Sequence, residues 1–223
     1  MARFFWHGGL GIQAGGTLPN PFDWFGGIFY INLDDRPDRR QALRLQLSQL
    51  GIEKKCSRFP AIKTPDNHHV GCALSHRALI AESRRRELKT VLVLEDDVLF
   101  HRKTILLLQN MLKELETVEW DLFYFGGHTW GEEKARIPGC KSLRTPLAIT
   151  TTHAIAYNHT AFDRFLDVLP ETHDQMKLWL DRWKGFDRYL NKSSFRKVVA
   201  DPMIAMQEEL FHQPNPPRRR DFL

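Results

Sequence analysis

The sequence predicts an α/β fold, with a mostly parallel central sheet flanked by helices in a single domain. Apolar runs typical of strands, at 28–33, 90–96 and 121–125, alternate with segments whose apolar residues recur at helical spacing. Short connections between such segments are typical of strand–helix–strand units, in which helices cover a parallel sheet. The 223 residues, of which 42% are hydrophobic, suffice for one such core.

The expected elements follow one another in order. The strand at 28–33 leads into a helix at about 37–50, where leucines three and four residues apart form an apolar stripe before Gly51. Four consecutive apolar residues at 91–94 predict a strand buried on both faces. Residues 131–146 contain glycines and prolines, and we expect a loop there that moves over a site. The other expected elements are helices at 75–88, 104–116, 160–169 and 176–183, strands at 148–158 and 197–206, and a short piece at 187–190.

Cysteine usage and hydropathy bound the class of protein. Cys56, Cys72 and Cys140 are odd in number and lack Cys-x-x-Cys spacing, which argues against a disulfide framework and against a structural zinc site. No apolar run approaches the roughly 18 residues that span a bilayer, and the N-terminus lacks the features of a signal peptide. We therefore expect a soluble protein of the reducing cytoplasm.

The formal net charge of +5 favours anionic partners such as nucleotides, phosphorylated substrates or anionic lipid. Nucleic acid is not an expected partner, because no known reader motif is present and acids balance the positive charge locally. Outside the domain at 28–206, residues 1–27 form a glycine- and aromatic-rich arm and residues 207–223 a proline- and arginine-rich tail. The arginines at 218–220 would allow peripheral contact with a membrane surface. The aromatic residues of the arm would prefer burial, on the domain or on a partner.

Three adjacent carboxylates, Glu95, Asp96 and Asp97, end the buried strand. Carboxylates at such a strand end face the crevice in which open α/β sheets bind ligands. Because side chains alternate along a strand, Glu95 and Asp97 point to one side and Asp96 to the other, so the first and third can share a hard divalent metal. The alternative is a solvated acidic turn.

Further candidate residues follow other predicted strands. The segment 30–40 runs from a strand through a charged turn into a helix, where arginines suit a nucleotide diphosphate, or are exposed beside aspartates that cap the helix. A tight turn is expected at Gly71, and a helix is expected to begin at Ser75 or His76. These residues are either part of a site or, in the alternative, an ordinary helix cap and an ordinary polar residue. His153 lies in a strand, where a lone histidine is more often structural than a metal ligand.

Four motifs follow one another along the chain. They are Ile31-Asn-Leu-Asp-Asp-Arg-Pro-Asp-Arg-Arg40, Gly71-Cys-x-x-Ser-His76, Leu92-Val-Leu-Glu-Asp-Asp-Val98 and Trp120-Asp-Leu-Phe-Tyr-Phe-Gly126. In this order they strongly resemble the motifs of glycosyltransferase family 25, which includes bacterial lipooligosaccharide galactosyltransferases and the collagen galactosyltransferases. A third region of the family, a His-Ala-Tyr-like strand followed by a helix, is similar to His153-Ala-Ile-Ala-Tyr157. The resemblance spans roughly residues 28–206.

The resemblance implies a GT-A-type, Rossmann-like domain that transfers a hexose, galactose or glucose, from a UDP-sugar to a glycan, glycolipid or protein hydroxyl. It also implies inversion at the sugar carbon and a divalent metal, commonly Mn²⁺. An inactive member that binds glycans or serves as a scaffold is the alternative. By carry-over, Glu95 and Asp97 would hold the metal, and Asp187, with Glu208 as second choice, would be the catalytic base. The donor site would be lined by Asn32, Arg36, Arg40, Gly71, Ser75, His76, Asp96 and His153.

Overall fold

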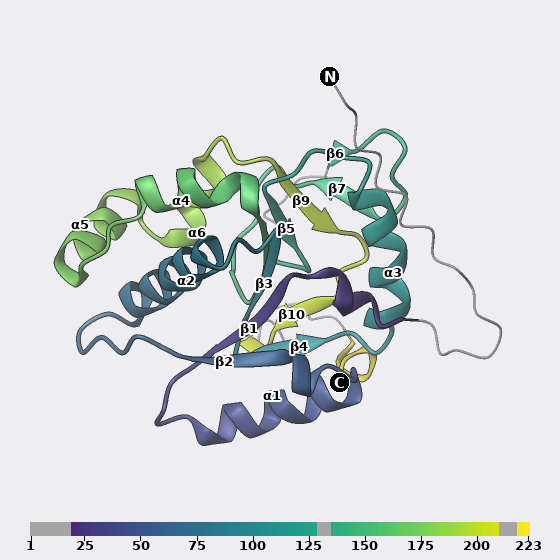
Figure 1. Cartoon of the computed structure of the whole chain (residues 1–223), viewed down its shortest axis with the longest axis horizontal. Coiled ribbons are helices and arrows are strands. Elements are labelled where there is room, and N and C mark those ends of the chain that lie inside the picture. Colours follow the sequence, from purple (N-terminus) through teal and green to yellow (C-terminus); the bar gives the residue numbers. More distant parts are fainter. Residues whose placement is uncertain (1–18, 129–134, 210–217) are drawn as a thin grey trace.

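The computed structural model describes residues 19–128, 135–209 and 218–223. Within them, an eight-stranded sheet has the strand order β2-β1-β3-β8-β5-β9-β7-β6 (Figure 1). A second, two-stranded sheet pairs β4 (Val98–Phe100) with β10 (Ala205–Gln207). The strands of the large sheet are β1 (Gly27–Asn32), β2 (Cys56–Pro60), β3 (Thr90–Glu95), β5 (Leu122–Tyr124), β6 (Ala135–Arg136), β7 (Leu143–Thr145), β8 (Ala154–Asn158) and β9 (Lys197–Ala200).

The expected mostly parallel sheet is confirmed. The pairings β1–β2, β1–β3 and β5–β9 are parallel, and strands β2, β1, β3, β5 and β9 run in one direction. Strand β8 lies reversed between β3 and β5, with Leu94 opposite Ala154. This insertion brings the residues that precede β8 beside the end of β3, which decides the composition of the site described below.

Helices cover both faces of the sheet, as predicted. Along β1 and β3, alternate residues belong to two different core clusters, so both strands are buried on both faces. Helices α1 (Pro37–Gln49) and α3 (Thr104–Leu115) pack in one cluster. On the opposite face lie α2 (His68–Arg85), α4 (Phe162–Val168), α5 (His173–Trp183) and α6 (Phe186–Lys192) (Figure 1). None of the helices in the described ranges is long and apolar enough to cross a membrane.

The N-terminal residues from 19 onward belong to the domain. Phe22 is fully buried and, with Phe25, packs against Phe125 in the core. The indole of Trp24 donates to Glu116 on the last turn of α3. The described part of the predicted arm therefore packs on the domain itself, which buries its aromatic residues Phe22 and Phe25. Residues 1–18 lie outside the described residues.

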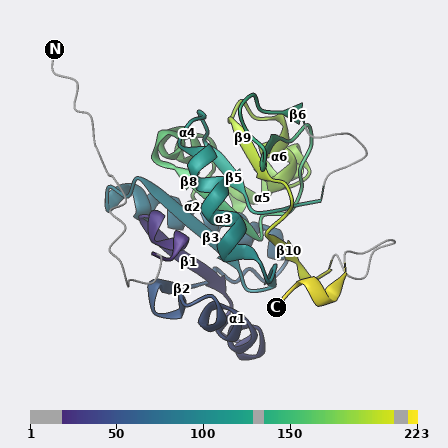
Figure 2. The same cartoon turned by 90° about the vertical axis from the view of Figure 1, so that its right-hand side faces the viewer.

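The end of the predicted tail is docked. A 3-10 helix, Arg219–Asp221, precedes Phe222, which is buried and stacks edge-on against His101. The backbone N–H of Leu223 donates to the carbonyl of Phe100, so the C-terminus is held at the small sheet, near β10 (Figure 2). The arginines at 218–220 remain exposed on this anchored turn. Residues 210–217 lie outside the described ranges.

Three expected elements are placed differently by the structure. The helix expected at 75–88 begins at His68, after Asn67, whose side-chain oxygen accepts from the N–H of His69 and caps the helix. Of the strand expected at 148–158, only 154–158 is a strand, because the preceding residues turn into the site. Part of the expected loop at 131–146 pairs as β6 and β7, and its residues 131–134 are not described.

Asp121, just before β5, connects several elements through a fully buried carboxylate. Its oxygens accept from the guanidinium groups of Arg164 on α4 and Arg196 beside β9, at 2.6 and 2.9 Å, and from the Thr160 hydroxyl. Burial alone would raise the pKa of Asp121, but these donors outweigh it and hold the pKa well below its usual range. The carboxylate thus joins α4 and β9 to the centre of the sheet.

We expect Asp121→Asn to lower the free energy of unfolding by about 2 kcal/mol at pH 7, because charge-assisted hydrogen bonds are lost. Because folding lowers the pKa of Asp121, its ionised carboxylate stabilises the fold at pH values above its unfolded-state pKa of about 4. This stabilisation is lost as the pH falls through the folded-state pKa. The difference between wild type and variant should therefore shrink below about pH 4 in urea titrations. Exposed Asp38 provides the control, since its ion pair with Arg36 is screened by solvent and Asp38→Asn should leave stability nearly unchanged. An Asp121→Asn deficit equal at pH 7 and pH 3 would contradict this assignment.

Candidate functional site

A cavity of about 740 Å³ opens at the carboxyl end of β3. Glu95 and Asp97 line it from the strand end, and Thr151 and Thr152 line it from the segment before β8. The first turns of α1 and α2, the connection between α5 and α6, and the end of β10 complete its wall. The carboxyl edge of a doubly covered sheet is where such folds bind ligands, so this cavity is the candidate site.

The three carboxylates at the end of β3 point in two directions, as the alternation of side chains along a strand predicts. Glu95 and Asp97 both line the cavity. Asp96 turns to the other side, where one oxygen accepts from the Asn32 amide at 2.7 Å and the other from the Arg39 guanidinium at 3.1 Å. Asp96 is thereby neutralised by the protein, whereas the other two carboxylates face the cavity.

Asp97 is only half satisfied. Its Oδ2 accepts from the Gln207 amide at 3.0 Å, while its Oδ1 is buried and has no hydrogen-bond partner among the described residues. Burial, reinforced by the charge of Glu95, raises the pKa of Asp97 to about 6. A buried carboxylate oxygen without a partner is costly unless a cation or a proton accompanies it. Glu95 and Asp97 together therefore fit a hard divalent cation.

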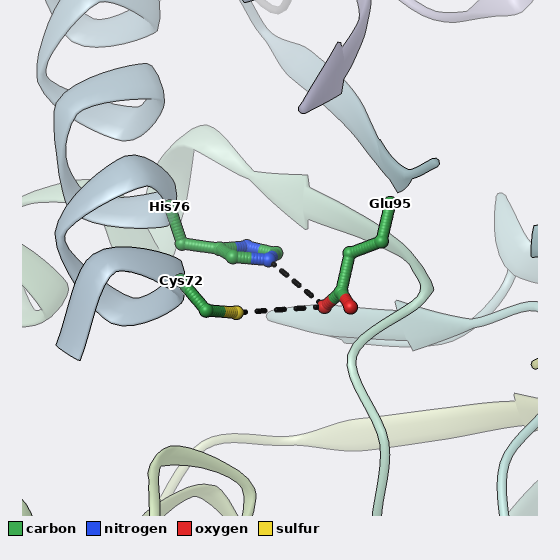
Figure 3. A group of neighbouring side chains, drawn as sticks. All are labelled: Cys72, His76 and Glu95. Atoms are coloured by element: carbon green, nitrogen blue, oxygen red, sulfur yellow. Dashed lines mark hydrogen bonds and ion pairs between the residues drawn. The ribbon is translucent and has the colours of Figure 1, made fainter. Parts of the chain in front are cut away.

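Glu95 has three neighbours on its Oε1. The Thr152 hydroxyl donates to it at 2.5 Å. The His76 Nε2 lies at 3.4 Å and the Cys72 Sγ at 3.7 Å from the same oxygen (Figure 3). Burial would raise the pKa of Glu95, but the facing imidazole and the hydroxyl outweigh burial, so the pKa falls below its usual value. Glu95 is accordingly ionised at neutral pH.

Two histidines stand behind the cavity wall. His76 is fully buried in the middle of α2, and its Nδ1 lies 2.9 Å from the Tyr157 hydroxyl. His153 is also fully buried, with Nδ1 2.9 Å from the Thr151 hydroxyl, and burial lowers its pKa to about 4. Neither side chain lines the cavity, but His76 lies beside Glu95 and His153 beside Thr151, which do.

Asp187 lines the cavity from the first turn of α6. Its Oδ1 accepts from the N–H of Arg188 at 2.8 Å, and its Oδ2 faces the N–H of Thr151 at 3.4 Å. Gly185 precedes it with φ +135°, and a Cβ there would lie 2.9 Å from Asp187 Oδ1, so glycine allows the carboxylate this position. The second candidate base, Glu208, is exposed, lies 3.7 Å from Arg219 and is outside the cavity lining.

The residues expected along the nucleotide pocket lie beside the cavity. The amide of Asn32 donates to Asp96 and to the carbonyl of Arg36, and its oxygen accepts from Arg58. Arg36 pairs with Asp38, and Arg40 is exposed. None of the three expected residues, Asn32, Arg36 and Arg40, lines the cavity.

Gly71 and Ser75 hold a neighbouring segment against α2. The expected tight turn at Gly71 is wrong, because the residue lies inside the helix. A Cβ there would lie 2.1 Å from the carbonyl oxygen of Ile62, so glycine permits the close approach of that segment. Ser75 fixes the same contact, since its oxygen accepts from the Ile62 N–H at 2.9 Å.

Four residues that line the cavity and contact the three carboxylates were not predicted from the sequence. Arg39 lies in the first turn of α1 and approaches both Asp96 and Asp97. Cys72 lies one helical turn before His76, a spacing visible in the sequence that points both side chains to one face. Thr152 and Gln207 reach the carboxylates only through the reversed β8 and the small sheet, so no local pattern identifies them.

Comparisons with known proteins match a part of the chain that includes Glu95, Asp97 and Thr152 of the cavity. Residues 67–172 match the model of glycosyltransferase family 25, described as an LPS biosynthesis protein. A glycosyltransferase 25 family member of Drosophila pseudoobscura pseudoobscura is 31% identical over 136 residues, 48% of this chain and 21% of the relative. Procollagen galactosyltransferase 1-A of Xenopus laevis is 30% identical over 148 residues, 53% of this chain and 24% of the relative.

Another relative is named as inactive. The inactive glycosyltransferase 25 family member 3 of Homo sapiens is 28% identical over 137 residues, 49% of this chain and 23% of the relative. The chain thus spans less than a quarter of the length of these curated relatives. Among solved structures, a glycosyltransferase involved in the glycosylation of the major capsid of PBCV-1 matches with TM-score 0.46 and 14% identity, covering 79% of this chain and 81% of that one.

Substitution by asparagine should change the free energy of unfolding in opposite directions at the adjacent residues Asp96 and Asp97. In chelator at pH 7, Asp97→Asn should raise the free energy of unfolding by about 2 kcal/mol, because it removes a buried charge that Glu95 repels. Asp96→Asn should lower it by about 1 kcal/mol, because the pair with partly exposed Arg39 is lost. Urea titration of both variants measures the two signs. Destabilisation by Asp97→Asn in chelator would show that the carboxylate is satisfied by the protein alone.

Proposed function

We propose that the chain transfers a hexose from a UDP-sugar to a hydroxyl group, because residues 67–172 match the model of glycosyltransferase family 25. Galactose or glucose is the proposed sugar, and a glycan, glycolipid or protein supplies the hydroxyl. The observation that carries the proposal is the pair of carboxylates on one cavity, with the Oδ1 of Asp97 buried and unpartnered among the described residues.

The residues of the cavity fit a divalent cation. Glu95 and Asp97 would hold it, and oxygen ligands of this kind favour Mn²⁺ or Mg²⁺, of which Mn²⁺ is our proposal. When bound, the cation neutralises the negative charge that develops on the diphosphate leaving group as the sugar is transferred.

Basic side chains on the same cavity suit the donor's diphosphate. Arg39 is 38% exposed and is held at the mouth of the cavity by Asp96. Its planar guanidinium is suited to paired contacts with phosphate oxygens. Lys184 and Arg188 line the opposite side, beside the start of α6. Arg39 thus takes the donor-binding role that the sequence pattern suggested for Arg36 and Arg40, which lie outside the lining.

Asp187 is the proposed catalytic base. An inverting transfer needs a group that accepts the proton of the attacking hydroxyl as the new glycosidic bond forms. The carboxylate of Asp187 lines the cavity and is held in place by contacts with two backbone N–H groups. Glu208 is unsuited to this role, because its side chain is exposed and lies toward Arg219.

A second candidate function is binding without turnover. It is favoured by the similarity to a relative that is named as inactive, at 28% identity. Such a protein would keep the donor cavity but lack transfer, and would act as a glycan-binding or scaffolding protein. The experiments below separate the two functions, because they measure donor binding and turnover independently.

The first experiment measures binding and hydrolysis of UDP-, GDP- and CMP-sugars with and without Mn²⁺. We expect one UDP-hexose to bind in a metal-dependent manner and to release UDP slowly. Asp97→Ala should abolish the metal-dependent binding of the UDP-sugar, because it removes the unpartnered oxygen of the site. Asp38→Asn, outside the cavity, is the control that should behave as wild type. Binding without release of nucleotide supports the scaffold function, and no binding of any donor refutes both.

The second experiment compares Asp187→Asn with Glu208→Gln. Asp187→Asn should lower the rate of transfer or hydrolysis by about 10²- to 10⁴-fold, because the proton acceptor is lost. Affinity for the UDP-sugar should remain within about twofold in calorimetry, since the variant is isosteric. Glu208→Gln should leave both quantities unchanged. A rate loss in Glu208→Gln without one in Asp187→Asn would reverse the assignment.

A further inference from the structure

A second group of potential metal ligands lies on the inner wall of the same cavity. Cys72 and His76 are one turn apart on α2, and Glu95 ends β3. Figure 3 shows the three side chains pointing toward one another from these two elements. One ligand atom from each lies within 4.8 Å of the other two. Thiolate, imidazole and carboxylate are the three ligand types that zinc uses in proteins.

Two of the three spacings between these atoms match a tetrahedral site, and the third, between Cys72 Sγ and His76 Nε2, is within 4.8 Å. With usual zinc–ligand distances, a sulfur and an oxygen ligand are about 3.5 Å apart, and a nitrogen and an oxygen ligand about 3.3 Å apart. The structure has 3.7 Å between Cys72 Sγ and Glu95 Oε1, and 3.4 Å between His76 Nε2 and the same oxygen. Only small side-chain adjustments would therefore place a zinc ion between the three groups.

The nitrogen that His76 directs at this group lacks a hydrogen bond. His76 is fully buried, and its Nε2 makes no hydrogen bond within the described residues, although it lies 3.4 Å from Glu95 Oε1. Its Nδ1 lies 2.9 Å from the Tyr157 hydroxyl, which can accept the Nδ1–H and leave the Nε2 lone pair directed at the group. The Thr152 hydroxyl orients Glu95 in the same manner. Hydrogen bonds of this kind orient the ligands of protein metal sites.

We propose that Cys72, His76 and Glu95 form a binding site for a borderline divalent cation, with Zn²⁺ as the best fit. Cys72 and Glu95 line the cavity, so the fourth coordination position faces it and is open to water or to a ligand. On binding, the Cys72 thiol loses its proton to solvent and the sulfur bonds to the cation. Burial raises the pKa of this thiol, so the group is protonated when no cation is present.

This site is distinct in chemistry from the oxygen site at Asp97. A sulfur and a nitrogen ligand select zinc or cobalt, whereas Mn²⁺ and Mg²⁺ prefer oxygen ligands. The two sites share Glu95, and a cation bound by Cys72 and His76 would engage the carboxylate proposed for Mn²⁺. Zinc would then compete with Mn²⁺ for Glu95. This competition rests on the proposed function, whereas the zinc site itself does not depend on that function.

The test is a titration of the whole chain, under reducing conditions, with Co²⁺ as the spectroscopic probe. We expect one equivalent to produce the near-ultraviolet charge-transfer band of a cobalt–thiolate bond, and Zn²⁺ to displace it. Cys72→Ser should abolish the band and weaken Zn²⁺ binding at least about 100-fold, and His76→Gln should also weaken binding. The matched controls Cys56→Ser and Cys140→Ser should keep the band, because neither sulfur belongs to the group.

Exposed histidines at the cavity mouth provide a further control. His68 and His69 are exposed neighbours, and they would give surface binding without a thiolate band. The double variant His68→Ala/His69→Ala should retain the band. A band that persists in Cys72→Ser, or its absence in wild type, overturns the proposal. If Cys72→Ser fails to fold, X-ray absorption of zinc-loaded wild type decides, since a site without one sulfur at about 2.3 Å overturns it equally. No readout depends on transferase activity, so failure of the proposed function remains distinguishable.

Discussion

The burial of three adjacent carboxylates at the end of β3 is the constraint on which the rest of the site depends. Three like charges removed from water require compensation, and the fold supplies it differently to each. Asp96 is paired with Asn32 and Arg39, and Glu95 is surrounded by Thr152, His76 and Cys72. Asp97 accepts from the Gln207 amide and lies 3.7 Å from Arg39, but its Oδ1 has no hydrogen-bond partner among the described residues. Of the two carboxylates that face the cavity, Asp97 is thus the less compensated and has the greater need of a cation.

This compensation comes from parts of the chain that are distant in sequence. Helix α1 contributes Arg39, α2 contributes Cys72 and His76, and β10 contributes Gln207. Thr152 arrives because β8 is inserted in reverse beside β3, so the residues before β8 meet the carboxyl end of the neighbouring strand. If β8 ran parallel to β3, the residues that precede β8 would lie at the opposite ends of the strands, away from the carboxyl end of β3. The topology of one strand therefore decides the composition of the wall.

Comparison of Asp121 with Asp97 shows how stability and function separate in this fold. Asp121 is completely buried, yet two guanidinium groups, a hydroxyl and a backbone N–H satisfy it, so its charge stabilises the sheet. Asp97 has an oxygen without a partner among the described residues, and its pKa is raised to about 6. A residue that carries such a cost is a candidate for ligand binding rather than for holding the fold.

The sequence by itself determined the α/β class, the strand buried on both faces and the separation of Glu95 and Asp97 from Asp96. These features follow from the spacing of apolar residues and from the alternation of side chains, which are local. It did not predict that Arg39, rather than Arg36 or Arg40, lines the cavity. Nor did it predict the close approach that requires Gly71, or the burial of Phe22 and Phe25. The tertiary structure also assembled Cys72, His76 and Glu95, a ligand set that Cys-x-x-Cys spacing could not reveal. Such contacts join residues far apart along the chain, and their geometry depends on strand order and packing, which no local pattern encodes.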